Sequence, residues 1–186
     1  SQGDRVPQNH AEAFRLFAAV ADKHADAQPG SPTATFVASS FVALGHFYEE
    51  GSEAAGIAVN RRQAQRLYEH AAFYFDDPDA QYQLARFHFE AEKISRGKRR
   101  QATRVLVLAA RKGHPKAAAR LGSMLIDGEH LRRDVVQGLK FLTIALRHAG
   151  VADRSAIQSA QERAYSLASE QQRRQAIDLA QAEFSD

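Results

Sequence analysis

The chain is 186 residues long, 44% hydrophobic and 25% charged, with a formal net charge of +3 at pH 7. It has no cysteine, which excludes disulfides and a thiol nucleophile, and no run of about 18 apolar residues that could cross a membrane. This is an ordinary composition for a globular domain, and the mild positive charge allows an acidic partner without requiring one.

The first predicted element is a helix over residues 11–21. Asn9, with Glu12 three residues later, is typical of a capped helix N-terminus, and residues 1–8 have the character of the loop before it. No partner helix precedes this one in the sequence. We therefore interpret residues 1–21 as the C-terminal half of a truncated repeat and expect the chain to be a piece of a longer protein.

Residues 22–37 form a predicted insertion loop. Pro29, Gly30, Ser31 and Pro32 make the segment rich in turn-forming residues. Such a loop is either a tolerated surface insertion or a contact or protease-sensitive site, and the residues favour neither.

A helix pair follows and defines the repeat of the chain. Its first helix contains LGHFYEEG, in which Gly45 allows close approach of a neighbour and Gly51 ends the helix, and its second contains AQRLYEHAA from Ala64 onward. The first motif recurs at Leu84 and Leu121, at spacings of 40 and 37 residues. A constant period of this size indicates stacked helix pairs, which we place at residues 38–75, 76–113 and 114–150.

Helix ends in these pairs follow a common pattern. Asn60 and Asp134 each precede a glutamine by three residues, as in a capped N-terminus, whereas the corresponding position of the middle pair is Lys98, which cannot cap. Gly113 is expected to close one helix and Pro115 to open the next.

Residues 151–186 are predicted to form a degenerate terminal pair with helices at 153–168 and 170–184. Ser169 and Gln172 form a capping box between them. The expected apolar faces are Ile157, Ala160, Ala164 and Leu167 on the first helix and Ile177, Ala180 and Phe184 on the second.

These motifs resemble the Sel1-like repeat family, a relative of the tetratricopeptide repeats that has a longer loop between its helices. The resemblance implies an all-α, right-handed α-solenoid over residues 1–186 as a single domain, with a C-terminal capping helix pair. It also implies that partners bind the inner face formed by the first helices of the pairs. The exposed motif positions, and hence the candidate partner-binding residues, are Val42, His46, Glu49, Tyr82, Arg86, Phe89, Ser123 and Ile126.

No catalytic or cofactor-binding motif is present: there is no Walker loop, no dinucleotide-binding fingerprint and no zinc-protease motif. We expect no enzyme activity, no metal and no cofactor. Asp76, Asp77 and Asp79 form one dense carboxylate cluster, which is either a helix cap or a weak cation site. Among the eight histidines, His46 and His88 are candidates for a pH switch, the alternative being ordinary structural residues.

Basic pairs recur just before the predicted second helices. In stacked repeats they would line one edge as a basic ridge, formed by Arg61, Arg62, Arg99, Arg100, Arg132 and Arg133. The ridge is either solvated charge or a site for an acidic protein surface, an anionic polysaccharide or lipid headgroups. Nucleic acid is not expected, because no aromatic residues are interleaved for base stacking.

Several segments are similar to one branch of the family, the exopolysaccharide production negative regulators (ExoR type). They are AQYQLARFHF, RKGHPKAAARLG and SLASEQQRRQAIDLAQ, whereas Ala91 departs from the glycine expected in that loop. The likeness implies a periplasmic protein that inhibits the sensor domain of a membrane histidine kinase and is released by acid or proteolysis. The alternatives are a general scaffold or adaptor for an envelope complex, an enzyme-class protein such as a cell-wall hydrolase or lactamase accessory, and self-association.

Overall fold

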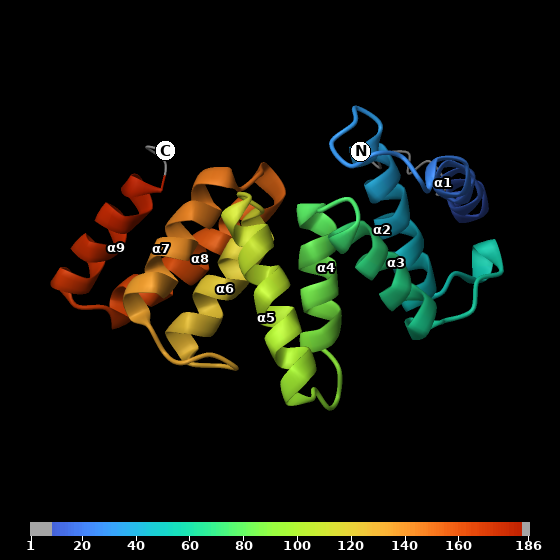
Figure 1. The fold of residues 1–186 in the computed structure, drawn as a ribbon. Helices are drawn as coiled ribbons and strands as arrows, with labels where there is room; N and C mark the ends of the chain where they lie inside the picture. Colours follow the sequence, from blue (N-terminus) through green and yellow to red (C-terminus); the bar gives the residue numbers. More distant parts are fainter. Residues whose placement is uncertain (1–8, 184–186) are drawn as a thin grey trace, which may run out of the picture. The chain divides into compact units, whose positions relative to one another are not determined.

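The computed structural model describes residues 9–183 and is all-α over that range (Figure 1). The described helices are α1 (His10–His24), α2 (Ala34–Glu50), the 3-10 helix η1 (Glu53–Ala55), α3 (Arg61–Phe73), α4 (Pro78–Phe89), α5 (Arg96–Arg111), α6 (Pro115–Asp127), α7 (Val135–His148), α8 (Val151–Leu167) and α9 (Glu170–Ala182). Predictions that involve residues 1–8 and Phe184 lie outside the described residues.

The chain divides into two compact units, Ser1–Phe87 (unit 1) and His88–Asp186 (unit 2). In unit 1, α2 packs against both α1 and α3; in unit 2, α6 packs against α5 and α7, and α7 also packs against α8 and α9. Several helices that follow one another within a unit, from α1 to α3 and from α5 to α8, are therefore neighbours in space, as expected for helix pairs. The single-domain prediction for residues 1–186 stays a prediction.

The α2–α3 pair of unit 1 is built on one glycine and one tyrosine. A Cβ atom on Gly45 would lie 2.4 Å from Cε1 of Tyr68, so only glycine admits the ring. Tyr68 and Ala64 are fully buried on α3, and α2 ends at Gly51, whose φ of 74° is in the left-handed region. The predicted roles of both glycines are confirmed.

In unit 2, α6 and α7 approach closely for a similar reason. A Cβ atom on Gly122 would lie 2.8 Å from the carbonyl oxygen of Gly138, and one on Gly138 would lie 2.8 Å from Cδ1 of Ile126. The core beside this contact contains Leu139 and Leu142, both nearly inaccessible to solvent. Two glycines facing each other thus bring these helices backbone to backbone.

The predicted caps are largely confirmed. The side chains of Asn9, Asn60 and Asp134 accept from the backbone N–H three residues later, at 3.1, 3.0 and 3.0 Å. The capping box of Ser169 and Gln172 is also present.

In the middle repeat Lys98 does not cap, as predicted, but the helix begins earlier than its aligned position. Ser95 caps α5 by accepting from the backbone N–H of Lys98, so Lys98 lies inside the helix rather than before it.

The bounds of one loop and the apolar faces of the terminal helix pair also differ from the prediction. The loop expected over residues 22–37 is shorter, since α1 continues to His24 and α2 begins at Ala34. In the terminal pair, Ile157 and Ala164 are buried as expected, but Leu167 and Ile177 are 58% and 37% exposed. On α9, Ala176 and Ala180 face the core, so the prediction is confirmed for Ala180 and wrong for Ile177, whose neighbour Ala176 is buried instead. None of the helices described is long and apolar enough to cross a membrane.

Candidate functional site

Three of the eight candidate partner-binding residues are buried, so the prediction that they are exposed was wrong. Val42, Phe89 and Ile126 are only 4%, 8% and 5% exposed. Val42 is buried because α2 packs against helices on two sides, and Ile126 fills the contact beside Gly138. Within unit 2, Phe89 stacks on His130 with ring centroids 5.1 Å apart.

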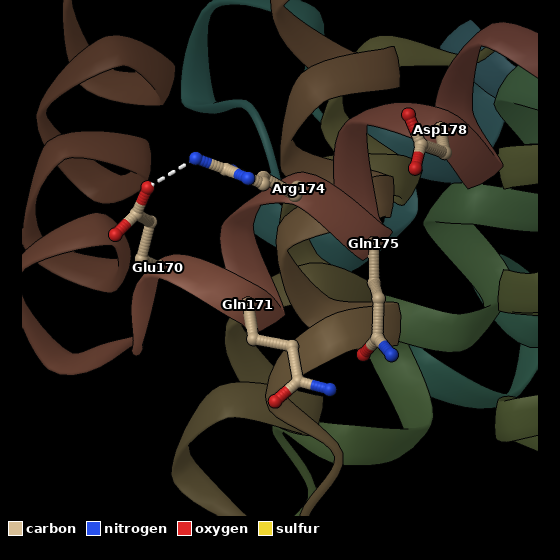
Figure 2. Close-up of a pocket in the computed structure, with 5 residues that line it drawn as sticks. All are labelled: Glu170, Gln171, Arg174, Gln175 and Asp178. Atoms are coloured by element: carbon tan, nitrogen blue, oxygen red, sulfur yellow. Dashed lines mark hydrogen bonds and ion pairs between the residues drawn. The ribbon is translucent and has the colours of Figure 1, made fainter.

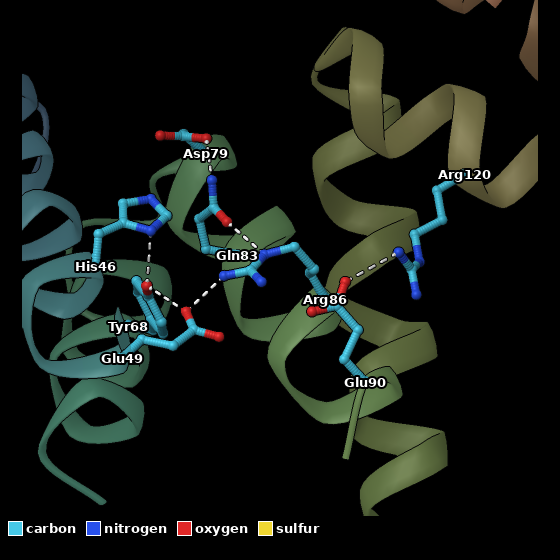
Figure 3. Close-up of polar contacts among 8 residues, drawn as sticks. All are labelled: His46, Glu49, Tyr68, Asp79, Gln83, Arg86, Glu90 and Arg120. Carbon is cyan, nitrogen blue, oxygen red and sulfur yellow. Dashed lines mark hydrogen bonds and ion pairs between the residues drawn. The ribbon is translucent and has the colours of Figure 1, made fainter. Parts of the chain in front are cut away.

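The five remaining candidates, His46, Glu49, Tyr82, Arg86 and Ser123, are half-buried. The structure brings three of them together around the hydroxyl of Tyr68, on the helices α2, α3 and α4 of unit 1 (Figure 3). Tyr68 donates to Oε2 of Glu49 at 2.9 Å, and Nη2 of Arg86 reaches the same oxygen at 2.5 Å. Nδ1 of His46 lies 3.1 Å from the Tyr68 oxygen. We call these four residues the Tyr68 network.

The network continues along α4 through polar side chains. Nε of Arg86 donates to Oε1 of Gln83 at 3.0 Å, and Nε2 of Gln83 donates to Asp79 at 3.4 Å (Figure 3). The side chain of Glu49 is 8% exposed and that of Arg86 is 22% exposed. A carboxylate this deeply buried needs a cation and hydrogen-bond donors, and the network supplies both.

Protons in the network are placed by its connectivity. Because the Tyr68 hydroxyl donates its only hydrogen to Glu49, Nδ1 of His46 must be the donor to Tyr68. Burial, and then the charge of Glu49, raise the pKa of Tyr68 well above its ordinary value, so the phenol stays protonated.

A pocket of about 270 Å³ lies beside the network, between α1 and the C-terminal turns of α2. Its lining residues are His10, Ala43, His46, Phe47, Glu50 and Gly51. Of these six residues, only His46 was predicted as a partner-binding residue. The missed signal is the acidic Glu49–Glu50 end of a helix whose last turn contains no basic residue.

The second pH-switch candidate, His88, is buried at 4% exposure near the end of α4. Its role in a pH response stays a prediction.

The basic pairs do not occupy equivalent positions, so the predicted ridge needs correction. Arg61 and Arg62 begin α3, Arg99 and Arg100 lie within the first turns of α5, and only Arg132 and Arg133 precede their helix. The guanidinium of Arg61 lies 4.6 Å from the centre of the Phe87 ring, and Nε of Arg133 donates to the carbonyl of Ile126.

Some of the exposed positive charge of unit 2 follows one face of α5. Arg96, Arg100, Arg104 and Arg111 are exposed, share an arc of about 80° on an ideal helix, and belong to a helix without an acidic residue.

The aspartate cluster forms a helix start. Oδ1 of Asp77 accepts from the backbone N–H of Ala80 at 2.8 Å, and Oδ1 of Asp76 accepts from Nε2 of Gln81 at 2.7 Å. These contacts are those of a cap and its flanking turn. Over residues 9–183, no group of three or more potential ligands is arranged to hold a metal ion.

A further hollow lies on the exposed side of α9, and its lining is polar (Figure 2). Arg174 donates to Glu170 at 2.5 Å across it, with both side chains 76% exposed. An ion pair this exposed is well solvated, so the hollow does not provide a low-dielectric site for chemistry.

The comparison with known protein families matches the repeats of the chain. A family model described as Sel1 repeat matches residues 1–23, 42–72, 78–114 and 115–148, which is more than half of the chain. A crystal structure of a Sel1 repeat protein from Oxalobacter formigenes is similar in fold, with a TM-score of 0.56 and 21% identity, covering 78% of this chain and 58% of that one.

Two curated relatives carry the name exopolysaccharide production negative regulator. They come from Rhizobium leguminosarum bv. viciae and Rhizobium meliloti (strain 1021), and each is 32% identical to this chain over 179 residues, or 96% of its length. The chain spans 64% of the length of each relative.

Proposed function

The chain belongs to the Sel1 repeat family, and on that premise we propose that it is a non-enzymatic negative regulator that acts by protein contact. Its partner in this proposal is the periplasmic sensor domain of a membrane histidine kinase, which it holds inactive and from which acid or proteolysis releases it. The observation that carries the proposal is the 32% identity, over 96% of the chain, to two proteins named as negative regulators of exopolysaccharide production.

The geometry of unit 1 supports a protein-binding role. The Tyr68 network holds the side chains of His46 and Arg86 in fixed positions while leaving both half-exposed. Side chains that are already ordered lose little conformational entropy on binding, which favours affinity. We place the binding face of unit 1 on His46, Tyr82 and Arg86; Ser123 of unit 2 stays a separate candidate.

The test is calorimetric titration of the folded chain with the periplasmic domain of the sensor kinase encoded beside it or co-regulated with it, at pH 7 and pH 5.5. We expect binding at pH 7 that weakens at pH 5.5. Tyr82→Ser should weaken binding, because aromatic residues are frequent anchors of interfaces, whereas Arg104→Gln on the exposed face of α5 should not. Equal affinity at both pH values would contradict acid release, and unchanged binding by Tyr82→Ser would contradict the proposed face.

A second candidate is a general scaffold for an envelope protein complex. It is favoured by the Sel1 match itself, since the family pattern covers more than half of the chain and specifies stacked helix pairs rather than a particular partner. Absence of sensor binding at either pH, with circular dichroism showing a folded chain, would favour this reading. Sedimentation of the chain alone tests the further prediction of self-association.

A further inference from the structure

We propose that the pocket between α1 and the end of α2 is an anchor site for a lysine or arginine side chain of the protein partner. The inference rests on the proposed protein-binding function and specifies the chemistry that this part of the face recognises. The pocket measures about 270 Å³ and lies entirely within unit 1.

Charge is the first argument. The C-terminus of a helix carries a partial negative charge, and cations are stabilising there. Helix α2 nevertheless ends with Glu49 and Glu50 and has no basic residue in its last turn. Arg86 balances Glu49, whereas no described residue forms an ion pair with Glu50, which is exposed at the pocket rim. The pocket therefore has an uncompensated negative end.

Shape is the second argument. The Phe47 ring is held by edge-to-face contacts with His10 and Phe14, with centroids 6.0 and 5.5 Å apart. Phe47 and the small Ala43 give the pocket an apolar floor. Lysine and arginine have long aliphatic stems that pack on apolar surface while their charged ends reach a polar rim. Such a side chain could lie on Phe47 and bring its charge to Glu50.

The same arrangement selects against other side chains. An aliphatic side chain would cover the floor but leave Glu50 without a counter-charge, and an acidic one would be repelled by both Glu50 and the helix end. An aromatic ring face attracts cations in addition. The combination of an aromatic floor and a free carboxylate thus favours a basic side chain.

The first experiment needs no knowledge of the partner. The ¹⁵N-labelled chain is titrated with N-acetyl-lysine amide, N-acetyl-arginine amide and, as an uncharged control, N-acetyl-norleucine amide. We expect the two basic probes to cause saturable shifts of the Phe47 and Gly51 amide signals, with binding of norleucine amide weaker by up to about fivefold, because it lacks the ion pair.

Two matched variants remove the same charge three residues apart. Glu50→Gln should weaken the binding of N-acetyl-lysine amide about fivefold. Glu53→Gln, on the exposed η1 helix, should leave it unchanged. Equal binding of norleucine amide, absence of saturable shifts, or identical behaviour of the two variants would overturn the proposal.

The sensor-domain titration separates this inference from the proposed function. If the sensor domain binds, and Glu50→Gln weakens this binding while Glu53→Gln does not, the regulator proposal and the anchor site are both supported. If binding is unaffected by Glu50→Gln, the anchor site is wrong and the regulator proposal survives. If the sensor domain does not bind but lysine amide still depends on Glu50, the pocket chemistry stands and the proposed partner is wrong.

Discussion

The hydroxyl of Tyr68 links three helices of unit 1. It donates to Glu49 on α2, lies within hydrogen-bond distance of His46 on the same helix, and shares the Glu49 carboxylate with Arg86 of α4. The ring itself is fully buried against Gly45. A residue that the sequence marks only as part of the repeat motif AQRLYEHAA therefore also organises the polar contacts.

We expect the protein to lose stability at alkaline pH because of Tyr68. Its pKa is raised in the folded state, so above the ordinary tyrosine pKa of about 10 the unfolded chain releases a proton that the folded chain retains. The contribution of protonated Tyr68 to the free energy of unfolding is complete below that pH. It decreases by about 1.4 kcal/mol per pH unit above it. Urea unfolding of the wild type and Tyr68→Phe at pH 8 and pH 11 measures it. The stability advantage of the wild type should shrink between these pH values; a constant advantage would contradict the assignment.

The ion pair of Arg86 and Glu49 gives a second prediction. Arg86→Met should destabilise unit 1 by about 3 kcal/mol, the lower end for a broken buried pair because Arg86 is 22% exposed. The double variant Arg86→Met/Glu49→Gln should recover part of this loss, because it no longer leaves a buried carboxylate without a cation. Urea unfolding of the single and double variants measures the coupling. A double variant less stable than Arg86→Met alone would show that the charge is not what makes the single change costly.

At this scale, the sequence predicts residue positions better than it predicts their exposure. The motif spacing identified His46, Glu49 and Arg86, which the structure brings together. It could not show that Val42 and Ile126 are buried, because burial on the second side of a helix depends on neighbours that are distant in sequence. The pocket residue Glu50 was missed for a different reason: its signal, an acidic helix end without a basic residue, lies outside the repeat motif.

Helix ends were predicted well where a single side chain determines them. Asn9, Asn60, Asp134 and Ser169 all cap as expected, because the bond spans only three residues. The start of α5 was missed because alignment with the other repeats placed the cap at Lys98, whereas this helix is extended at its N-terminus back to Ser95. On α9 the prediction was wrong at Ile177, because the buried residue beside it is the small Ala176, which gives a weaker pattern than an isoleucine.

The contact between α6 and α7 depends on glycine. Gly122→Ala should destabilise unit 2 by about 1–3 kcal/mol, because the added methyl would lie 2.8 Å from the carbonyl of Gly138 and the backbone cannot easily move. Gly97→Ala in α5 is the matched control: its nearest neighbour is Oγ of Ser95 at 4.0 Å, and helix propensity should make it neutral or stabilising by up to about 1 kcal/mol. Urea unfolding followed by circular dichroism measures both. Shifts of the same sign and size would contradict a packing role for Gly122.

For the whole molecule, the sequence period predicted the fold class, and the Sel1 match agrees with it. Periodicity is a local property repeated along the chain, so it is readable without knowledge of tertiary contacts. A partner is not encoded in this way, because repeats of one fold serve many partners through their exposed residues. The regulator proposal accordingly depends on the likeness to named relatives rather than on the architecture.

The prediction of a single domain can be tested through cooperativity. The two compact units meet between residues 87 and 88, inside α4 (Pro78–Phe89), and a helix forms cooperatively along its length. In a repeat array, neighbouring units also stabilise one another. We therefore expect Gly45→Ala, which would bring a methyl group within 2.4 Å of Tyr68 in unit 1, to lower the unfolding midpoint of unit 2 as well. Amide signals of Ala64 and Leu139, followed through a urea titration, report the two units separately. A shift confined to Ala64 would mean that the chain folds as two independent domains.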